Sequence, residues 1–192
     1  MADGRFTRLK ISQRTSIWAE WMAIGLSLGF NLALAFYLPG AWFLAAAASN
    51  IYLVLVLNKQ LLAESFLHAF YVFMAFWGYQ NAIQTEAFNA PEWLWHHHLL
   101  AIVVAAVLAW LIGSLLKRFT NAKLPLLDSS TTVFSLLATW MMVHYMRENW
   151  LYFIGIDLAS AYLYAKRGMR PTAFLYLAYT ALAAYAWWQW QS

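Results

Sequence analysis

Long runs of apolar residues recur along the whole chain, with short polar stretches between them. A transmembrane helix needs about 20 mainly apolar residues, and seven runs approach that length. Proline or asparagine marks several of the breaks. We therefore predict an all-α membrane protein with seven transmembrane helices, at residues 17–38, 40–58, 62–82, 98–116, 127–146, 149–165 and 171–190.

The amino-acid composition argues against a soluble protein. Hydrophobic residues make up 64% of the 192 positions and charged residues 10%, whereas soluble domains are about half apolar and about a quarter charged. So few charges cannot cover a surface that faces water. The 12 Trp and 11 Tyr residues suit the interface between lipid and water. Without cysteine, neither disulfides nor thiolate chemistry can contribute.

Lys and Arg residues gather in the loops on one side of the seven predicted spans. They occur in segments 1–16, 117–123 and 166–170 and at Lys59, and only Arg147 falls on the other side. Positively charged loops stay in the cytoplasm. We therefore expect a multi-pass membrane protein with its N-terminus in the cytoplasm and its C-terminus outside. Contact with anionic lipid explains the net charge of +4 without nucleic acid as a partner.

A gapless self-alignment at an offset of 108 positions indicates an internal duplication. It pairs the first three spans with the last three and leaves the fourth as a linker. Both repeats then have the same orientation, an established plan for transporters that bind substrate between the halves. Matched pairs include Tyr37 with Tyr145, Trp42 with Trp150, Tyr71 with Tyr179 and Lys59 with Arg167. The expected organisation is a cytoplasmic segment at 1–16 and a transporter domain at 17–192, with repeat one at 17–82, a linker helix at 98–116 and repeat two at 127–190.

Asp157 lies near the middle of the sixth span, where a carboxylate is costly unless it faces a wet cavity or a polar partner. Its counterpart in the first repeat is Ser49, so the two halves differ there. Trp150, Phe153 and Asp157 share one helix face because their spacing is i, i+3, i+7. Two aromatic rings and an anion suit a flat, positively charged heterocycle. The alternative is that Asp157 only hydrogen-bonds a neighbouring helix.

Other polar and aromatic side chains are candidates for the same site. Gln80 and Asn50 rank first because we expect their spans, three and two, to pack against span six. Amide side chains in spans often only bind a neighbouring helix, which is the competing interpretation. The remaining candidates are Tyr79, Trp42, Tyr145, Glu148 and Asn149, and other polar groups that could join the cavity are Asn31, Ser49, Asn81 and His144.

Motifs for catalysis and for ATP hydrolysis are missing. The chain has no Gly-rich phosphate loop ending in Lys-Ser or Lys-Thr and no His-x-x-Glu-His pattern. Residues 96–98 are three histidines, but consecutive positions on a helix cannot all face one ion. We therefore expect no enzyme, cofactor or metal. Proton coupling through Asp157 and, more remotely, a membrane enzyme or structural subunit remain as alternatives.

The segment Glu148-Asn149-Trp150, followed by Asp157 and by the aromatic residues 174–179, resembles the PnuC family of vitamin transporters. Phe70-Tyr71 and Gly78-Tyr79-Gln80 in the third span strengthen the resemblance, which covers nearly the whole chain. It implies a fold like that of SWEET transporters in the opposite orientation, and a homotrimer. It also implies facilitated diffusion of a B-vitamin precursor, which a cytoplasmic kinase then traps.

The sixth span points to a substrate within that family. Family members that carry nicotinamide riboside resemble the pattern Trp-x-x-Trp-x-x-x-Asn, and this chain has Phe153 and Asp157 at its last two positions. The resemblance therefore favours the thiamine-carrying PnuT branch. Thiamine has a cationic thiazolium ring, and its aminopyrimidine offers donors to a carboxylate. Nicotinamide riboside, also a small cationic heteroaromatic compound, is the alternative.

Overall fold

The computed structural model describes residues 13–58, 62–84, 93–119, 124–166 and 170–190. These segments form seven α-helices and contain no strand, as predicted. The predicted N-terminal segment 1–16 lies mostly outside them. The helices are α1 (Gln13–Ala35), α2 (Ala41–Asn58), α3 (Leu62–Gln84), α4 (Trp95–Phe119), α5 (Pro125–Val143), α6 (Asn149–Lys166) and α7 (Arg170–Gln189).

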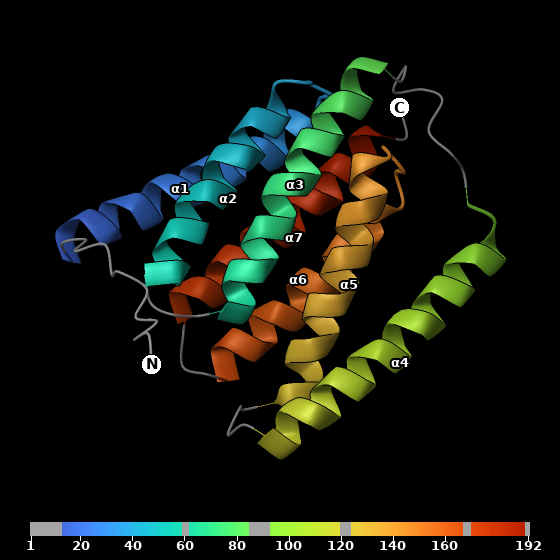
Figure 1. Ribbon diagram of the computed structural model, residues 1–192. Coiled ribbons are helices and arrows are strands. Elements are labelled where there is room, and N and C mark those ends of the chain that lie inside the picture. Colours follow the sequence, from blue (N-terminus) through green and yellow to red (C-terminus); the bar gives the residue numbers. More distant parts are fainter. Residues whose placement is uncertain (1–12, 59–61, 85–92, 120–123, 167–169, 191–192) are drawn as a thin grey trace, which may run out of the picture.

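All the helices except α4 form a closed ring of contacts, which can be followed in Figure 1. Within each repeat the helices pack in chain order, α1 on α2 on α3 and α5 on α6 on α7. The repeats meet where α1 contacts α7 and where α3 contacts α5. The expectation that α6 packs against α2 and α3 is wrong, because its neighbours in the ring are α5 and α7. Helix α2 lies across the ring from α6.

The turns that follow α1 and α5 occupy equivalent places in the two repeats and have the same backbone conformation. Tyr37 and Tyr145 both have a positive φ, of 54° and 56°, which residues with a Cβ rarely adopt. Each tyrosine is the left-handed residue of a Schellman motif, which ends the helix before it. The helix-ending bonds run from Leu38 N to Ala33 O and from Met146 N to Met141 O, both at 3.1 Å. The predicted first and fifth spans extended too far because they included these turns.

Other helix boundaries follow the same repeat. Helix α2 begins and ends at the positions equivalent to the two ends of α6, and α3 begins at the position equivalent to the start of α7. The seven helices are therefore arranged as three, one and three, with two structurally matched repeats. Helix α4 belongs to neither repeat, because it packs outside the ring against α5.

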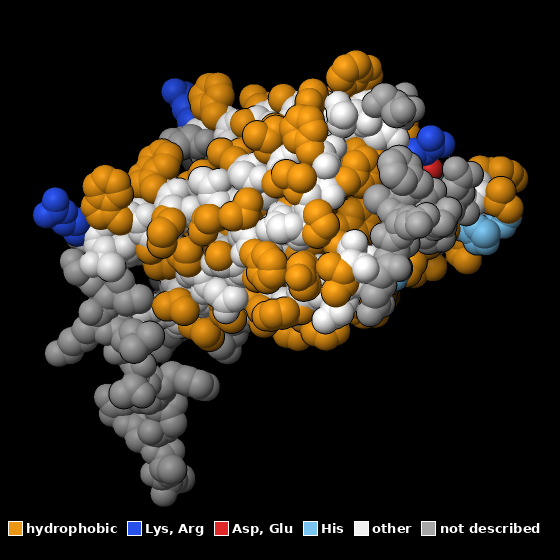
Figure 2. Space-filling view, turned by 90° about the horizontal axis from the view of Figure 1, so that it is seen from above, with side chains coloured by type: hydrophobic (Ala, Val, Ile, Leu, Met, Phe, Trp, Pro, Cys, Tyr) orange, Lys and Arg blue, Asp and Glu red, His pale blue; other side chains and the backbone are white. Residues whose placement is uncertain are grey.

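The outer surface of the ring is apolar. Figure 2 shows many hydrophobic side chains spread across the face in view, with the few charged groups near its edges. Many of them are large and exposed, for example Phe66, Leu100 and Phe174. Such a surface suits lipid rather than water. Among the described residues, the helices that are long and apolar enough by length and composition alone to cross a membrane are Arg14–Ala35, Trp95–Phe119 and Pro125–Val143.

Helix α4 approaches α5 closely through a row of small residues. Ala105, Ala109 and Gly113 follow each other at i, i+4 and i+8 and are buried, which is the spacing that lets membrane helices touch. Ser129 Oγ donates a hydrogen bond to Ala109 O at 2.7 Å. A Cβ on Gly113 would lie 2.6 Å from Ser129 Oγ and 2.9 Å from Leu126 Cα.

We expect Gly113→Leu to destabilise the protein by about 1–3 kcal/mol, because the new side chain must push α4 away from α5. Thermal unfolding in detergent measures this effect. The matched control is Gly25→Leu, because Gly25 is exposed on α1 and its Cβ would meet nothing within 4 Å. Equal melting temperatures for the two variants would contradict the proposed close approach.

Candidate functional site

A cavity of about 310 Å³ lies at the centre of the ring, and residues from all six ring helices line it. Its volume is near the lower end of the range for small-molecule sites. Helix α4 contributes none of the lining residues. The ring, and not the linker helix, therefore builds the site.

The cavity lies between the two repeats, because both members of many matched pairs line it. These pairs are Ser27 with Ser135, Asn31 with Thr139, Ala45 with Phe153, Ala48 with Ile156, Ser49 with Asp157, Tyr71 with Tyr179, and Ala75 with Ala183. Two of the pairs also join the repeats to each other. The Tyr71 side chain interacts with that of Ser135, and the Tyr179 side chain interacts with that of Ser27.

The matched pairs differ most in charge and size along α2 and α6. Repeat one contributes Ala45, Ala48 and Ser49, which are small and neutral. Repeat two has Phe153, Ile156 and Asp157 at the equivalent positions. The wall formed by α6 is therefore aromatic and acidic, while the opposite wall, formed by α2, has smaller and neutral side chains.

Asp157 is the most unusual polar group of the cavity wall. Its side chain is 6% exposed, lines the cavity and has no hydrogen-bond partner within the described segments. None of the described residues that line the cavity is Lys, Arg or His. A buried carboxylate is costly without an opposite charge or hydrogen bonds, so the site favours a ligand that carries a positive charge.

An aromatic cluster lies where α2 and α6 begin, and one of its members, Trp42, lines the cavity. We call it the aromatic cap; it consists of Tyr37, Trp42, Tyr145, Trp150 and Trp190. Trp42 Nε1 donates a hydrogen bond to the Tyr145 hydroxyl across the two repeats at 2.9 Å. Tyr37 stacks on Trp190 with ring centroids 4.4 Å apart, and Trp150 meets Trp190 edge-on at 5.4 Å. The cap explains why tyrosines, rather than glycines, occupy the two left-handed positions.

Five of the predicted site residues lie at the cavity or in the cap. Trp42, Phe153 and Asp157 line the cavity. Tyr145 and Trp150 belong to the cap, and the Trp150 ring lies 6.5 Å from that of Phe153. The predicted face of α6, with two aromatic rings and a carboxylate, is therefore present in the structure.

Asn50 and Gln80 do not line the cavity. Both are exposed, and the Asn50 amide donates to Ala46 O in its own helix at 2.8 Å. The preceding residue, Ser49, faces inward, and one residue further along a helix turns the side chain by about 100°. On α3 the inward positions are Tyr71 and its neighbours one turn away, which leaves Gln80 on another face.

Three further candidates also lie away from the cavity. Tyr79 packs on Phe43, and Glu148 pairs with Arg147 at 3.4 Å near the start of α6. Asn149 is fully buried, and its amide donates to Met146 O at 2.6 Å. Glu148 thus lies in the turn that precedes α6, and Asn149 is the first residue of that helix.

The histidines at 96–98 make separate contacts. The rings of His96 and His97 lie 4.1 Å apart, while His98 Nδ1 is 3.1 Å from the Tyr152 hydroxyl. No group of three side chains suited to hold a metal ion occurs in the segments that the structure describes.

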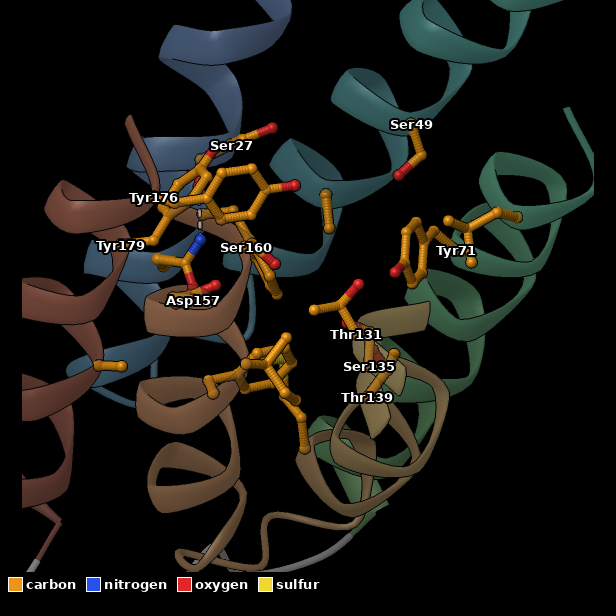
Figure 3. A pocket seen from close by; sticks show the side chains of 18 of the residues that line it. Ser27, Ser49, Tyr71, Thr131, Ser135, Thr139, Asp157, Ser160, Tyr176 and Tyr179 are labelled. Carbon is orange, nitrogen blue, oxygen red and sulfur yellow. Dashed lines mark hydrogen bonds between the residues drawn. The ribbon is translucent and has the colours of Figure 1, made fainter. Parts of the chain in front are cut away.

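The prediction missed the polar residues that other helices turn toward the cavity. Figure 3 shows Tyr71, Thr131, Ser135 and Thr139 together on one side, apart from Asp157. The three α5 residues follow each other at intervals of four, so a search for polar residues at helical spacing would have found them. The pairing of Tyr71 with Tyr179 in the repeat was a second signal.

Two parallel three-helix repeats around a polar cavity, within an apolar surface, define a membrane transporter. The sequence matches the model of the nicotinamide mononucleotide transporter family over residues 17–192, so the chain belongs to that family and is not an enzyme. The structure is similar to the crystal structure of the vitamin B3 transporter PnuC, with a TM-score of 0.73 and 19% sequence identity. The similarity covers 91% of this chain and 80% of that one. None of the curated proteins compared with the chain matches it.

Proposed function

We propose that this protein carries nicotinamide riboside, a cationic vitamin nucleoside, across the bacterial inner membrane by facilitated diffusion. The observation that carries the proposal is the Asp157 carboxylate, which faces the cavity without a partner in the described segments. A pyridinium ring would neutralise this charge and stack on Phe153. The family's name and the similar vitamin B3 transporter both support a nicotinamide compound.

The cavity favours a nucleoside over the nucleotide that gives the family its name. A phosphate group adds about two negative charges near neutral pH. The described lining has no Lys or Arg to receive them and contains two acidic residues, Asp128 and Asp157. Burying a phosphate beside these carboxylates would cost both desolvation and repulsion.

Thiamine is the second candidate, and the sixth helix is what favours it. Phe153 and Asp157 depart from the pattern of nicotinamide riboside carriers, and a carboxylate can accept hydrogen bonds from an aminopyrimidine. Both vitamins carry a positive charge, so the charge of the ligand does not decide between them. The family match and the similar structure favour the nicotinamide compound, so thiamine no longer ranks first.

Four further properties belong to this proposal. The N-terminus faces the cytoplasm and the C-terminus the periplasm, because Lys117, Arg118 and Lys166 occupy the last turns of α4 and α6 and positive charge stays inside. Uptake needs no ATP, and a cytoplasmic kinase traps the product. The protein forms a homotrimer, as the family resemblance implies.

Uptake into vesicles tests the proposal. We expect purified protein in liposomes to take up labelled nicotinamide riboside with saturation, without ATP and without an ion or proton gradient. Excess unlabelled riboside should compete, whereas nicotinamide mononucleotide should compete at least about tenfold less well, since it adds an unpaired buried charge. Thiamine measured in parallel decides between the candidates. Uptake driven by an imposed proton gradient would contradict facilitated diffusion and indicate proton coupling.

A further inference from the structure

Two buried residues in the cavity wall have hydroxyl groups that bond no other described residue. Ser49 on α2 is 9% exposed and Thr139 on α5 is 8% exposed. Both line the cavity, and neither hydroxyl has a hydrogen-bond partner within the described segments. Neither oxygen is enclosed by protein, because the buried side-chain atoms without a partner in the described segments are His68 Nδ1, Asn149 Oδ1 and Trp150 Nε1. Both hydroxyls are therefore open to the cavity, where a ligand can bond them.

Neighbouring hydroxyls show that hydroxyl groups in these helices do not generally lack a hydrogen-bond partner. Thr131 Oγ1 donates to Asp128 O at 2.9 Å, and Thr180 Oγ1 on α7 donates to Tyr176 O at 3.0 Å. Threonine in a helix can satisfy itself in this way with a carbonyl one turn earlier. Thr139 does not use this bond.

Ser49 and Thr139 lie apart from the acidic wall. In Figure 3, Asp157 and Ser160 stand with Tyr176 and Tyr179 on one side of the cavity, while Thr139 stands with Tyr71, Thr131 and Ser135 on another. Ser49 lies away from Asp157, on the same side as Tyr71. This agrees with the repeat, in which Ser49 and Asp157 occupy equivalent positions in opposite halves.

The wall around Ser49 also leaves room for part of a ligand. Its neighbours Ala45 and Ala48 take the positions that Phe153 and Ile156 hold in the other repeat. A ligand whose ring lies against α6 therefore meets space and neutral hydroxyls on the opposite side. Hydroxyls both donate and accept hydrogen bonds, as do the hydroxyls of a sugar.

We propose that Ser49 and Thr139 form a subsite for the uncharged, hydroxylated part of the substrate, opposite the carboxylate of Asp157. The inference rests on the proposed function, which places the positive ring at Asp157. It adds that the protein selects a glycosylated cation over a cation of the same ring without the sugar.

The test compares two ligands that share the positive ring. Nicotinamide riboside carries the sugar, and N1-methylnicotinamide replaces it with a methyl group. Calorimetric titration of the purified protein should show that Thr139→Val and Ser49→Ala each weaken riboside binding about tenfold. Binding of N1-methylnicotinamide should stay within about twofold of the wild type, which also shows that the variants fold. These expectations follow from losing one hydrogen bond to a buried ligand group.

Two matched controls remove hydroxyls that face away from the cavity lining. Thr180→Val and Ser130→Ala alter groups already bonded to Tyr176 O and Leu126 O, and both should leave the two affinities unchanged. An unchanged ratio of the two affinities in Thr139→Val and Ser49→Ala would overturn the subsite alone. Wild-type protein that binds neither ligand would overturn the proposed function and the subsite together.

Discussion

Asp157→Asn is expected to weaken binding of nicotinamide riboside by roughly 30- to 150-fold. The variant keeps the shape of the side chain and removes its charge. An interaction with a charged group contributes about 1.5–3 kcal/mol, and the upper part of that range applies because Asp157 is buried and the described cavity lining contains no basic side chain. Titration of the purified protein measures the loss, and uptake into liposomes should fall in parallel.

A neutral ligand of nearly the same shape separates charge from packing. Reduced nicotinamide riboside has no positive charge, so its binding should change less than about threefold in Asp157→Asn, because no ion pair is lost. Asp157→Glu keeps the charge and should retain part of the affinity for the oxidised riboside. Equal losses for the two forms would show that Asp157 acts through packing and not through its charge.

Ala48→Trp is expected to reduce uptake by roughly 10- to 100-fold. Ala48 is buried and lies in the α2 wall, which has small side chains, of a cavity of only about 310 Å³. An indole placed there fills the space opposite α6 that a substrate needs, and forcing a ligand into an overpacked site costs about 1–3 kcal/mol or more. Initial uptake rates in liposomes measure the effect.

The neighbouring alanine provides the control. Ala47 is exposed on the outer face of α2, where a tryptophan meets the surroundings of the ring and not the cavity. Ala47→Trp should therefore keep wild-type uptake, while both variants carry the same substitution in the same helix. Similar uptake by the two variants would place the transport path somewhere other than this cavity.

Much of the fold could be predicted because a membrane helix is specified locally. Each span needs enough apolar residues to cross the bilayer, and the backbone must satisfy its own hydrogen bonds there. The errors in the predicted helix ends occurred at turns. The ends of α1 and α5 were extended through Tyr37 and Tyr145, because tyrosine in a left-handed conformation gives no local signal of a helix end. Its stacking in the aromatic cap, which involves residues far away in the chain, stabilises that conformation.

The candidate site was predicted where a single residue was costly by itself. Asp157 could be found because a carboxylate within an apolar run is costly unless it faces a cavity or a polar partner. Phe153 followed from its place on the same helix face. Thr139 was not proposed as a ligand group, and Ser49 was one of several polar residues that could join the cavity, because hydroxyls occur in membrane helices for many reasons. Only their position at the cavity, without partners, distinguishes them from Thr180.

The sequence by itself determined the class of protein, the seven helices and the internal repeat, and it singled out Asp157 as a candidate. The tertiary structure decided the order of helices in the ring and the face that each one turns inward, and so replaced Asn50 and Gln80 with Ser49 and Tyr71. The physical reason is the solvent. Lipid tails are as apolar as a helix interface, so hydrophobic periodicity cannot tell the outside of a membrane helix from its inside. Packing between the repeats makes that choice.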